Sequence, residues 1–138
     1  MQLNTKCACV RARRASRTLT DVYDAALQPV GLKITQFSVL RTAQRMAPVS
    51  ISALAEEMAL DRSTLGRNLL LLKHRGLVRL GEGDDLRERS VELTARARAL
   101  LERATPLWDA AQAKVERQLG KQGVSTLFDL LLKLEQLP

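Results

Sequence analysis

The chain has 138 residues, close to the size of one domain, and 46% of them are apolar, which is enough to build a core. Aromatic residues make up only 3%, so leucine and alanine must fill that core, as they do in helical proteins. The net charge is +7, and no apolar run approaches the roughly 20 residues of a membrane span, so we expect a cytoplasmic protein.

The positive charge is concentrated in two segments. Residues 1–20 and residues 62–81 each carry several arginine or lysine side chains and no acidic one. Clustered positive charge favours a polyanionic partner, because neutralising phosphates releases counterions. The alternative is that these charges are only solvated helix faces.

The first half of the chain predicts three helices. Small and apolar residues recur at helical spacing over residues 9–27, and Pro29 and Gly31 end that helix. A second helix is expected from about Thr35, with Phe37 among the residues of its apolar face, and the proline at position 48 ends this region. A third, short helix is expected over residues 50–59.

The middle of the chain predicts a helix followed by a hairpin. Asp61 suits the N-cap of a fourth helix, and Gly76 suits the position just after its end. Residues 77–80 and 90–93 are typical of two short strands, and the glycines and aspartates between them supply a turn. Helix, tight turn, basic helix and hairpin in this order indicate a winged helix-turn-helix.

The last part of the chain predicts two helices. Thr94 can cap a long fifth helix, which Pro106 should kink or deprive of a hydrogen bond. Residues 120–123 predict a break, and the leucines from Leu127 onward form a last amphipathic helix.

The expected fold is mainly α, with a small β-hairpin wing and terminal helices that form a dimerisation region. Residues 1–34 would be an N-terminal arm and dimerisation helix, 35–93 the winged helix-turn-helix DNA-binding domain, and 94–138 the C-terminal dimerisation helices. The terminal helices carry apolar stripes that one subunit has little else to cover, so we expect a homodimer. The alternative is that these helices fold back on their own core.

The fourth helix carries the residues expected to read DNA. Its leucines at 65, 69 and 72 fall on one face, and Ser63, Thr64 and Arg67 point the opposite way, with Asn68 at the flank. Arginine pairs with guanine and asparagine with adenine, and helix-turn-helix proteins place such residues in the major groove. Simple helix capping is the alternative role of the two hydroxyl residues.

Arginines at the expected hairpin tip extend this surface. Arg87 and Arg89 suit the narrow minor groove, and Asp85 could hold Arg87 in place. A solvated charged turn is the alternative. The full set of expected DNA-binding residues is Arg62, Ser63, Thr64, Arg67, Asn68, Arg75, Arg87 and Arg89.

The order and spacing of these features resemble the multiple-antibiotic-resistance regulator (MarR) family. The matching residues are Leu27-x-Pro29-x-Gly31-Leu32-x-x-Thr35-Gln36-Phe37-x-x-Leu40, Leu54-Ala55, Asp61-Arg62-Ser63-Thr64-Leu65, Gly76-Leu77-Val78, Asp85-x-Arg87 and Leu93-Thr94. The resemblance implies a homodimer that binds pseudo-palindromic promoter DNA, usually as a repressor. It also implies release by a small, often phenolic or anionic molecule, or by oxidation of a cysteine.

The sequence allows two modes of control. The resemblance places Cys9, with Cys7 close by, where organic-hydroperoxide-sensing members of the family carry their reactive cysteine, although Arg13 and Ile34 replace tyrosines of that branch. The alternative is a ligand pocket between the dimerisation helices and the winged helix-turn-helix. Its candidate lining residues are Tyr23, Phe37 and Trp108, which could equally be plain core.

Other classes of function find little support in the sequence. The single histidine, His74, and the lack of zinc-type cysteine and histidine spacing argue against a metal site. We expect no cofactor and no enzymatic activity, because a thiol enzyme using Cys9 would need a nearby base. A winged-helix module that binds protein instead of DNA is a further alternative, and acidic residues on the fourth helix would favour it.

Overall fold

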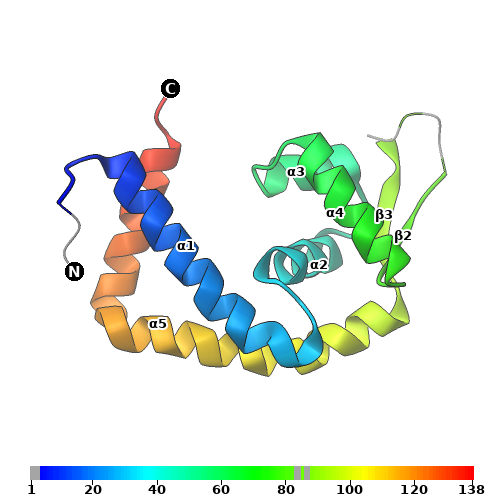
Figure 1. Cartoon of the computed structure of the whole chain (residues 1–138). Helices are drawn as coiled ribbons and strands as arrows, with labels where there is room; N and C mark the ends of the chain where they lie inside the picture. The colour runs from blue at the N-terminus through cyan, green and yellow to red at the C-terminus, as the bar shows by residue number, and fades with distance from the viewer. Residues whose placement is uncertain (1–3, 83–84, 86–87) are drawn as a thin grey trace.

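The computed structural model describes residues 4–82, 85 and 88–138, and it joins long helices to a small three-stranded sheet (Figure 1). The predicted mainly helical fold with a hairpin wing is confirmed. In chain order the elements are α1 (Ala8–Leu27), the 3-10 helix η1 (Gln28–Val30), α2 (Ile34–Met46), β1 (Val49–Ser50), α3 (Ile51–Glu57), α4 (Arg62–His74), β2 (Val78–Leu80), β3 (Ser90–Leu93) and α5 (Ala95–Glu135).

Helices α2, α3 and α4 pack with the sheet around one apolar core. Phe37, Leu40, Leu54 and Leu69 are among its fully buried side chains, and the described residues include no buried polar or charged residue. The sheet is antiparallel in the order β1-β3-β2. Strand β1, which pairs with β3, was not predicted, because two residues before a helix carry no readable alternation.

The terminal helices form the other half of the molecule. Helix α1 packs along α5, which runs beneath α2 and then turns sharply (Figure 1). The helix continues through Pro106 and leaves helical geometry at Gly120, where φ is 75° and ψ is 161°. The predicted break at 120–123 is thus confirmed at Gly120, and helical geometry resumes directly after that residue.

Side-chain caps fix where the helices begin. The Asp61 carboxylate accepts from the Thr64 backbone N–H at 2.8 Å, and the Thr94 hydroxyl oxygen accepts from the Ala97 backbone N–H at 3.1 Å, as predicted. The same Thr94 hydroxyl donates to the Gly76 carbonyl at 2.7 Å. The end of α4 is therefore fastened to the start of α5.

The turn between α3 and α4 contains a strained residue. Ala59 has φ 52°, a left-handed conformation that a Cβ atom disfavours. Ala59→Gly should therefore raise the free energy of unfolding by about 1 kcal/mol, measured by urea denaturation. Ala110→Gly, at an exposed position inside α5, is the matched control and should lower it by a similar amount. An Ala59→Gly protein no more stable than the parent would contradict the prediction.

Within the described ranges, no helix combines the length and the apolar character needed to cross a membrane.

Candidate nucleic-acid interface

Helix α4 divides into a buried face and an exposed face, as the sequence predicted. Leu65, Leu69 and Leu72 are completely buried against the core. Ser63 and Arg67 are exposed on the outer side, where Arg62 is exposed too, while Thr64 and Asn68 are half-buried at its edges. The helix thus presents hydroxyl, guanidinium and amide groups from its first two turns. Leu70 and Leu71 are also exposed, at 45% and 56%.

The hydroxyl groups at the start of α4 are organised by Asp61. The Ser63 hydroxyl donates to its Oδ1 at 2.5 Å, and the Thr64 hydroxyl donates to its Oδ2 at 2.7 Å. These hydrogen bonds hold the pKa of the Asp61 carboxyl well below its usual range, and the bond from Ser63 contributes most. Because both hydroxyl protons are engaged, the lone pairs of Ser63 and Thr64 remain to accept hydrogen bonds from a partner.

This arrangement predicts a pH-dependent contribution of Asp61 to stability. Its pKa is lower in the folded chain than in the unfolded chain, so its contribution is present above the unfolded pKa and is lost as pH falls through the folded value. Between about pH 5 and about pH 3, thermal melting should therefore show a steeper loss of Tm for the parent than for Asp61→Ala. Asp109→Ala, an exposed acid on α5, should melt in parallel with the parent. Parallel curves for Asp61→Ala would contradict the role.

Arg75 lies far from the polar residues in the first two turns of α4. It follows the last residue of α4, thirteen positions after Arg62, which corresponds to roughly 20 Å of helix. Its Nη1 donates to Gln36 Oε1 at 3.4 Å, and that oxygen also accepts from the Lys33 backbone N–H at 3.0 Å. The side chain is thereby directed toward the start of α2 instead of along the outer face of α4.

The wing is described only in part. Arg87 lies outside the described residues, and so does the contact predicted between it and Asp85. Asp85 is exposed and its carbonyl accepts from the Glu88 backbone N–H at 3.1 Å. Arg89 is half-buried, and its carbonyl accepts from the Ile51 backbone N–H at 3.1 Å, which ties the hairpin to the start of α3.

The three aromatic residues predicted to line a pocket do meet. The Trp108 ring lies 6.2 Å from the Phe37 ring, nearly parallel to it, and 6.3 Å from the Tyr23 ring. The Tyr23 hydroxyl donates to the Gln112 amide oxygen, and burial, followed by the nearby Glu116 carboxylate, raises the pKa of Tyr23. Phe37 is fully buried, whereas Tyr23 and Trp108 are half-buried.

A hollow of about 470 Å³ nevertheless opens beside Trp108. Its lining residues are Phe37, Ser38, Arg41, Thr42, Gln44, Arg45 and Trp108, so Tyr23 does not belong to it. The Arg41 guanidinium lies 4.8 Å from the centre of the Trp108 ring, a cation–π distance. The sequence analysis missed Arg41 and Arg45, although they follow Phe37 at spacings of four residues and so share its helix face.

An ion pair connects this hollow to helix α3 of the helix-turn-helix. Arg45 Nη2 lies 2.7 Å from Glu57 Oε1, which joins α2 to the end of α3. The two side chains are 63% and 45% exposed, so the pair itself adds little stability. It is instead a breakable link between the hollow and the helix-turn-helix.

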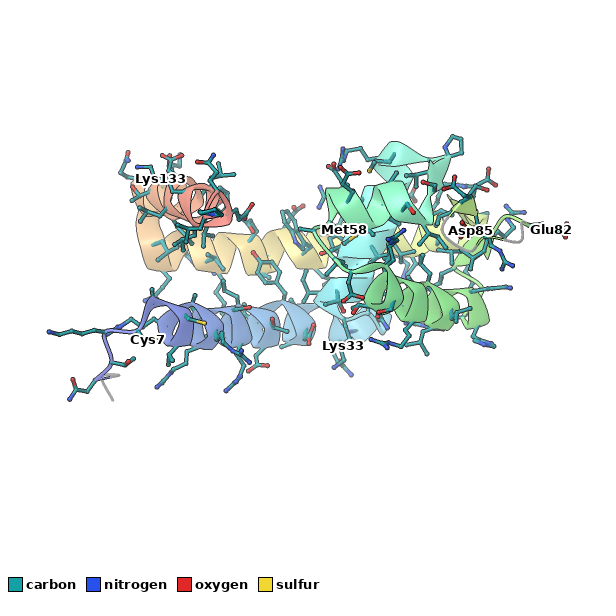
Figure 2. The ribbon with its side chains drawn as sticks, turned by 90° about the horizontal axis from the view of Figure 1, so that it is seen from above. Cys7, Lys33, Met58, Glu82, Asp85 and Lys133 are labelled. Atoms are coloured by element: carbon teal, nitrogen blue, oxygen red, sulfur yellow. The ribbon has the colours of Figure 1, made fainter. Side chains whose placement is uncertain are left out.

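Cys7 lies at the far end of the molecule from the wing residues Glu82 and Asp85 (Figure 2). Cys7 is the N-cap of α1, Cys9 lies in its first turn, and both are exposed free thiols. The Cys7 backbone N–H donates to the Thr5 hydroxyl at 3.1 Å. Among the residues that the structure describes, no group of three or more histidine, cysteine or acidic side chains could hold a metal ion.

Known proteins share both the sequence pattern and the fold. A MarR family model matches residues 30–88. The Mycobacterium tuberculosis transcriptional regulator MosR is 37% identical, with 98% of this chain and 100% of that chain covered and a TM-score of 0.83. Its structure in complex with DNA is 39% identical, covers 96% and 100%, and has a TM-score of 0.77.

A third similar structure holds a small aromatic acid. It is a MarR family protein of M. tuberculosis in complex with p-aminosalicylic acid, 28% identical, with 94% of this chain and 99% of that chain covered and a TM-score of 0.67. The exposed polar face of α4, the winged fold and these matches agree with one another. The chain belongs to the MarR family of DNA-binding transcriptional regulators.

Proposed function

We propose that the protein is a homodimeric repressor that binds a pseudo-palindromic operator in double-stranded DNA. The observation that carries this proposal is the outer face of α4, where Ser63, Thr64, Arg67 and Asn68 stand opposite the buried leucines. Arg62 is exposed at the start of the same helix and can contact a phosphate. Arg87 and Arg89 of the wing would reach the adjacent minor groove, whereas Arg75 is directed away from this face.

Uncovered apolar surface supports the dimer. Among the described residues, most of the large apolar side chains that remain exposed lie in α5 from Leu119 onward and just after it: Leu119, Phe128, Leu130, Leu131, Leu132, Leu134 and Leu137. An apolar groove of about 620 Å³ runs beside them between α1 and α5. Patches of this kind mark protein interfaces, and a second copy of the chain would cover them.

Release of the operator by a small aromatic anion is the mode of control that the hollow beside Trp108 supports best. An aromatic ring can stack on Trp108, and a carboxylate can pair with Arg41 and Arg45. A carboxylate that draws Arg45 away competes with Glu57 for the guanidinium. The ion pair between α2 and α3 would then break and free the helix-turn-helix to change position. A ligand that binds this second arrangement more tightly shifts the population away from the DNA-binding one.

This mode of control is testable through Trp108, the single tryptophan of the chain. Benzoate, used as the probe, should change Trp108 fluorescence saturably and weaken operator binding over the same concentrations. Arg41→Gln should raise the benzoate concentration needed at least 10-fold, since it removes the charged partner. Arg117→Gln, an exposed arginine farther along α5, should leave it unchanged. A fluorescence signal that does not saturate would eliminate the hollow as the inducer site.

A thiol switch is the second candidate mode of control, favoured by the exposure of Cys7 and Cys9. An organic hydroperoxide would oxidise the Cys9 thiolate to a sulfenic acid and leave as an alcohol. Attack by a second thiol would then form a disulfide and release water. Operator binding should be lost on adding cumene hydroperoxide and restored by a thiol in the parent but stay unaffected in Cys9→Ser. An oxidant-insensitive parent would exclude this mode.

The regulatory function itself is tested by capturing fragments of the protein's own genome. The purified protein should enrich a few fragments, and these should lie upstream of genes. Their binding should weaken steeply with salt, as phosphate contacts demand. Capture of all fragments alike, or none at physiological salt, would favour the protein-interaction module instead.

A further inference from the structure

A second hollow lies where α4, η1 and the start of α5 meet, away from the reading face. It has a volume of about 310 Å³. Its lining residues are Val30, Arg75, Leu77, Arg96, Ala99, Leu100 and Arg103. In Figure 1, α4 begins beside α3 and ends beside the first turns of α5, so this hollow is at the opposite end of α4 from Ser63.

Three of the residues that line the hollow are arginines, and none of its lining residues is acidic. Arg96 and Arg103 lie seven residues apart on α5, which places them on one helix face two turns apart. Within the described part of the chain, neither of them makes a hydrogen bond or an ion pair. Of the three arginines, only Arg75 has a hydrogen-bond partner among the described residues, the neutral Gln36 side-chain amide at 3.4 Å. Three like charges thus converge on one concave site without a compensating anion.

Two glycines in left-handed turns lie beside these guanidiniums. Gly31 and Gly76 have φ values of 69° and 72°, so each turn requires a residue that tolerates the left-handed conformation. A Cβ at Gly31 would lie 3.5 Å from Arg75 Nη2, and one at Gly76 would lie 3.7 Å from Arg96 Nη1. One guanidinium nitrogen of Arg75 and one of Arg96 thus lie close to the backbone of these two turns.

We propose that this hollow binds a small organic anion, phosphorylated or polycarboxylate, as a second effector site distinct from the hollow beside Trp108. The planar fork of each arginine matches the paired oxygens of such groups, and the apolar floor of Val30, Leu77 and Leu100 receives a short carbon skeleton. A volume near 300 Å³ admits a small metabolite and excludes a nucleic acid strand.

The position of the site gives it a consequence for DNA binding. Arg75 belongs to the end of α4, whereas Arg96 and Arg103 belong to α5, and the Thr94–Gly76 hydrogen bond of 2.7 Å already joins these segments. An anion bridging the three arginines would tie the reading helix to the dimer helices. Operator and anion must then alter each other's affinity by the same factor. This consequence rests on the proposed repressor function, but anion binding itself does not.

Calorimetric titration of the full-length protein at fixed ionic strength tests the proposal. Pyrophosphate and citrate are the two probes, because they separate the phosphate source from the carboxylate source. At least one of them should give one saturable site per chain. The double variant Arg96→Gln, Arg103→Gln should weaken that binding at least 10-fold, whereas the control Arg117→Gln, Lys121→Gln carries the same loss of charge on α5 and should not.

Three results would overturn the proposal. One is the lack of a saturable site for either probe, and another is equal weakening by the control variant. The third is a double variant that binds operator DNA more weakly and with a smaller salt slope in the absence of any probe, which would make these arginines DNA phosphate contacts. Thermal melting of each variant checks that it is folded, and normal operator capture with no anion binding would refute the site while leaving the repressor function intact.

Discussion

Replacing Arg67 with alanine is expected to weaken operator binding by about 1–3 kcal/mol, a loss of roughly 5- to 150-fold. Arg67 is exposed on the outer face of α4, one turn after the hydroxyl groups that Asp61 holds. A guanidinium at that place can take two hydrogen bonds from one guanine, and alanine can take none. The variant should therefore also lose its preference for one base pair in each half-site.

Fluorescence anisotropy with operator duplexes measures both effects. Each base pair of a half-site is changed in turn, and the affinity is compared between the parent and Arg67→Ala. Arg117→Ala, which removes an exposed arginine from α5, controls for the loss of charge. Because α4 is packed through its leucines, Arg67→Ala should melt like the parent. Equal weakening on all sequences would make Arg67 a phosphate contact and remove it from the base-reading set.

Introducing charge into the exposed apolar surface of α5 should have the other large effect. Phe128 and Leu131 lie three residues apart on one face of α5 and are 52% and 40% exposed in the single chain. If a second copy covers them, aspartate at both positions buries two unpaired charges in the interface, which the dimer cannot tolerate. Phe128→Asp, Leu131→Asp should be monomeric and bind the operator roughly 100-fold or more weakly, because the two half-sites are no longer linked.

Light scattering reports the mass, and circular dichroism reports whether the helices remain. Gln122→Asp, Thr126→Asp adds the same charge on the opposite face of this part of α5 and should stay dimeric. A Phe128→Asp, Leu131→Asp protein that keeps the parent's mass would show that these side chains do not lie in the interface.

Helix α4 was predictable because several local sequence signals agree there. Three signals specify the start, the buried face and the end of α4: the Asp61 cap, the spacing of Leu65, Leu69 and Leu72, and the glycine at position 76. The structure shows all three features. The outward direction of Ser63 and Arg67 follows from the same periodicity. Such local agreement is what sequence patterns record best.

Features that depend on contacts distant in sequence were missed. Strand β1 exists only because Val49 pairs with Val91. The arrangement of Arg41 over Trp108 joins residues of α2 and α5 that are far apart in the chain. Ala59 adopts a left-handed conformation that glycine, asparagine or aspartate would more often occupy. In each case the rest of the fold determines the local geometry.

Selection from a random pool of DNA duplexes, made in parallel with the parent and Arg67→Ala, tests the central claim most directly. The parent should enrich an inverted repeat whose two half-sites are centred one helical turn, about 10 base pairs, or a multiple of that apart. Arg67→Ala should enrich the same repeat with one position relaxed in each half. No enriched repeat from the parent, or identical sequences from both proteins, would contradict DNA reading by this face of α4.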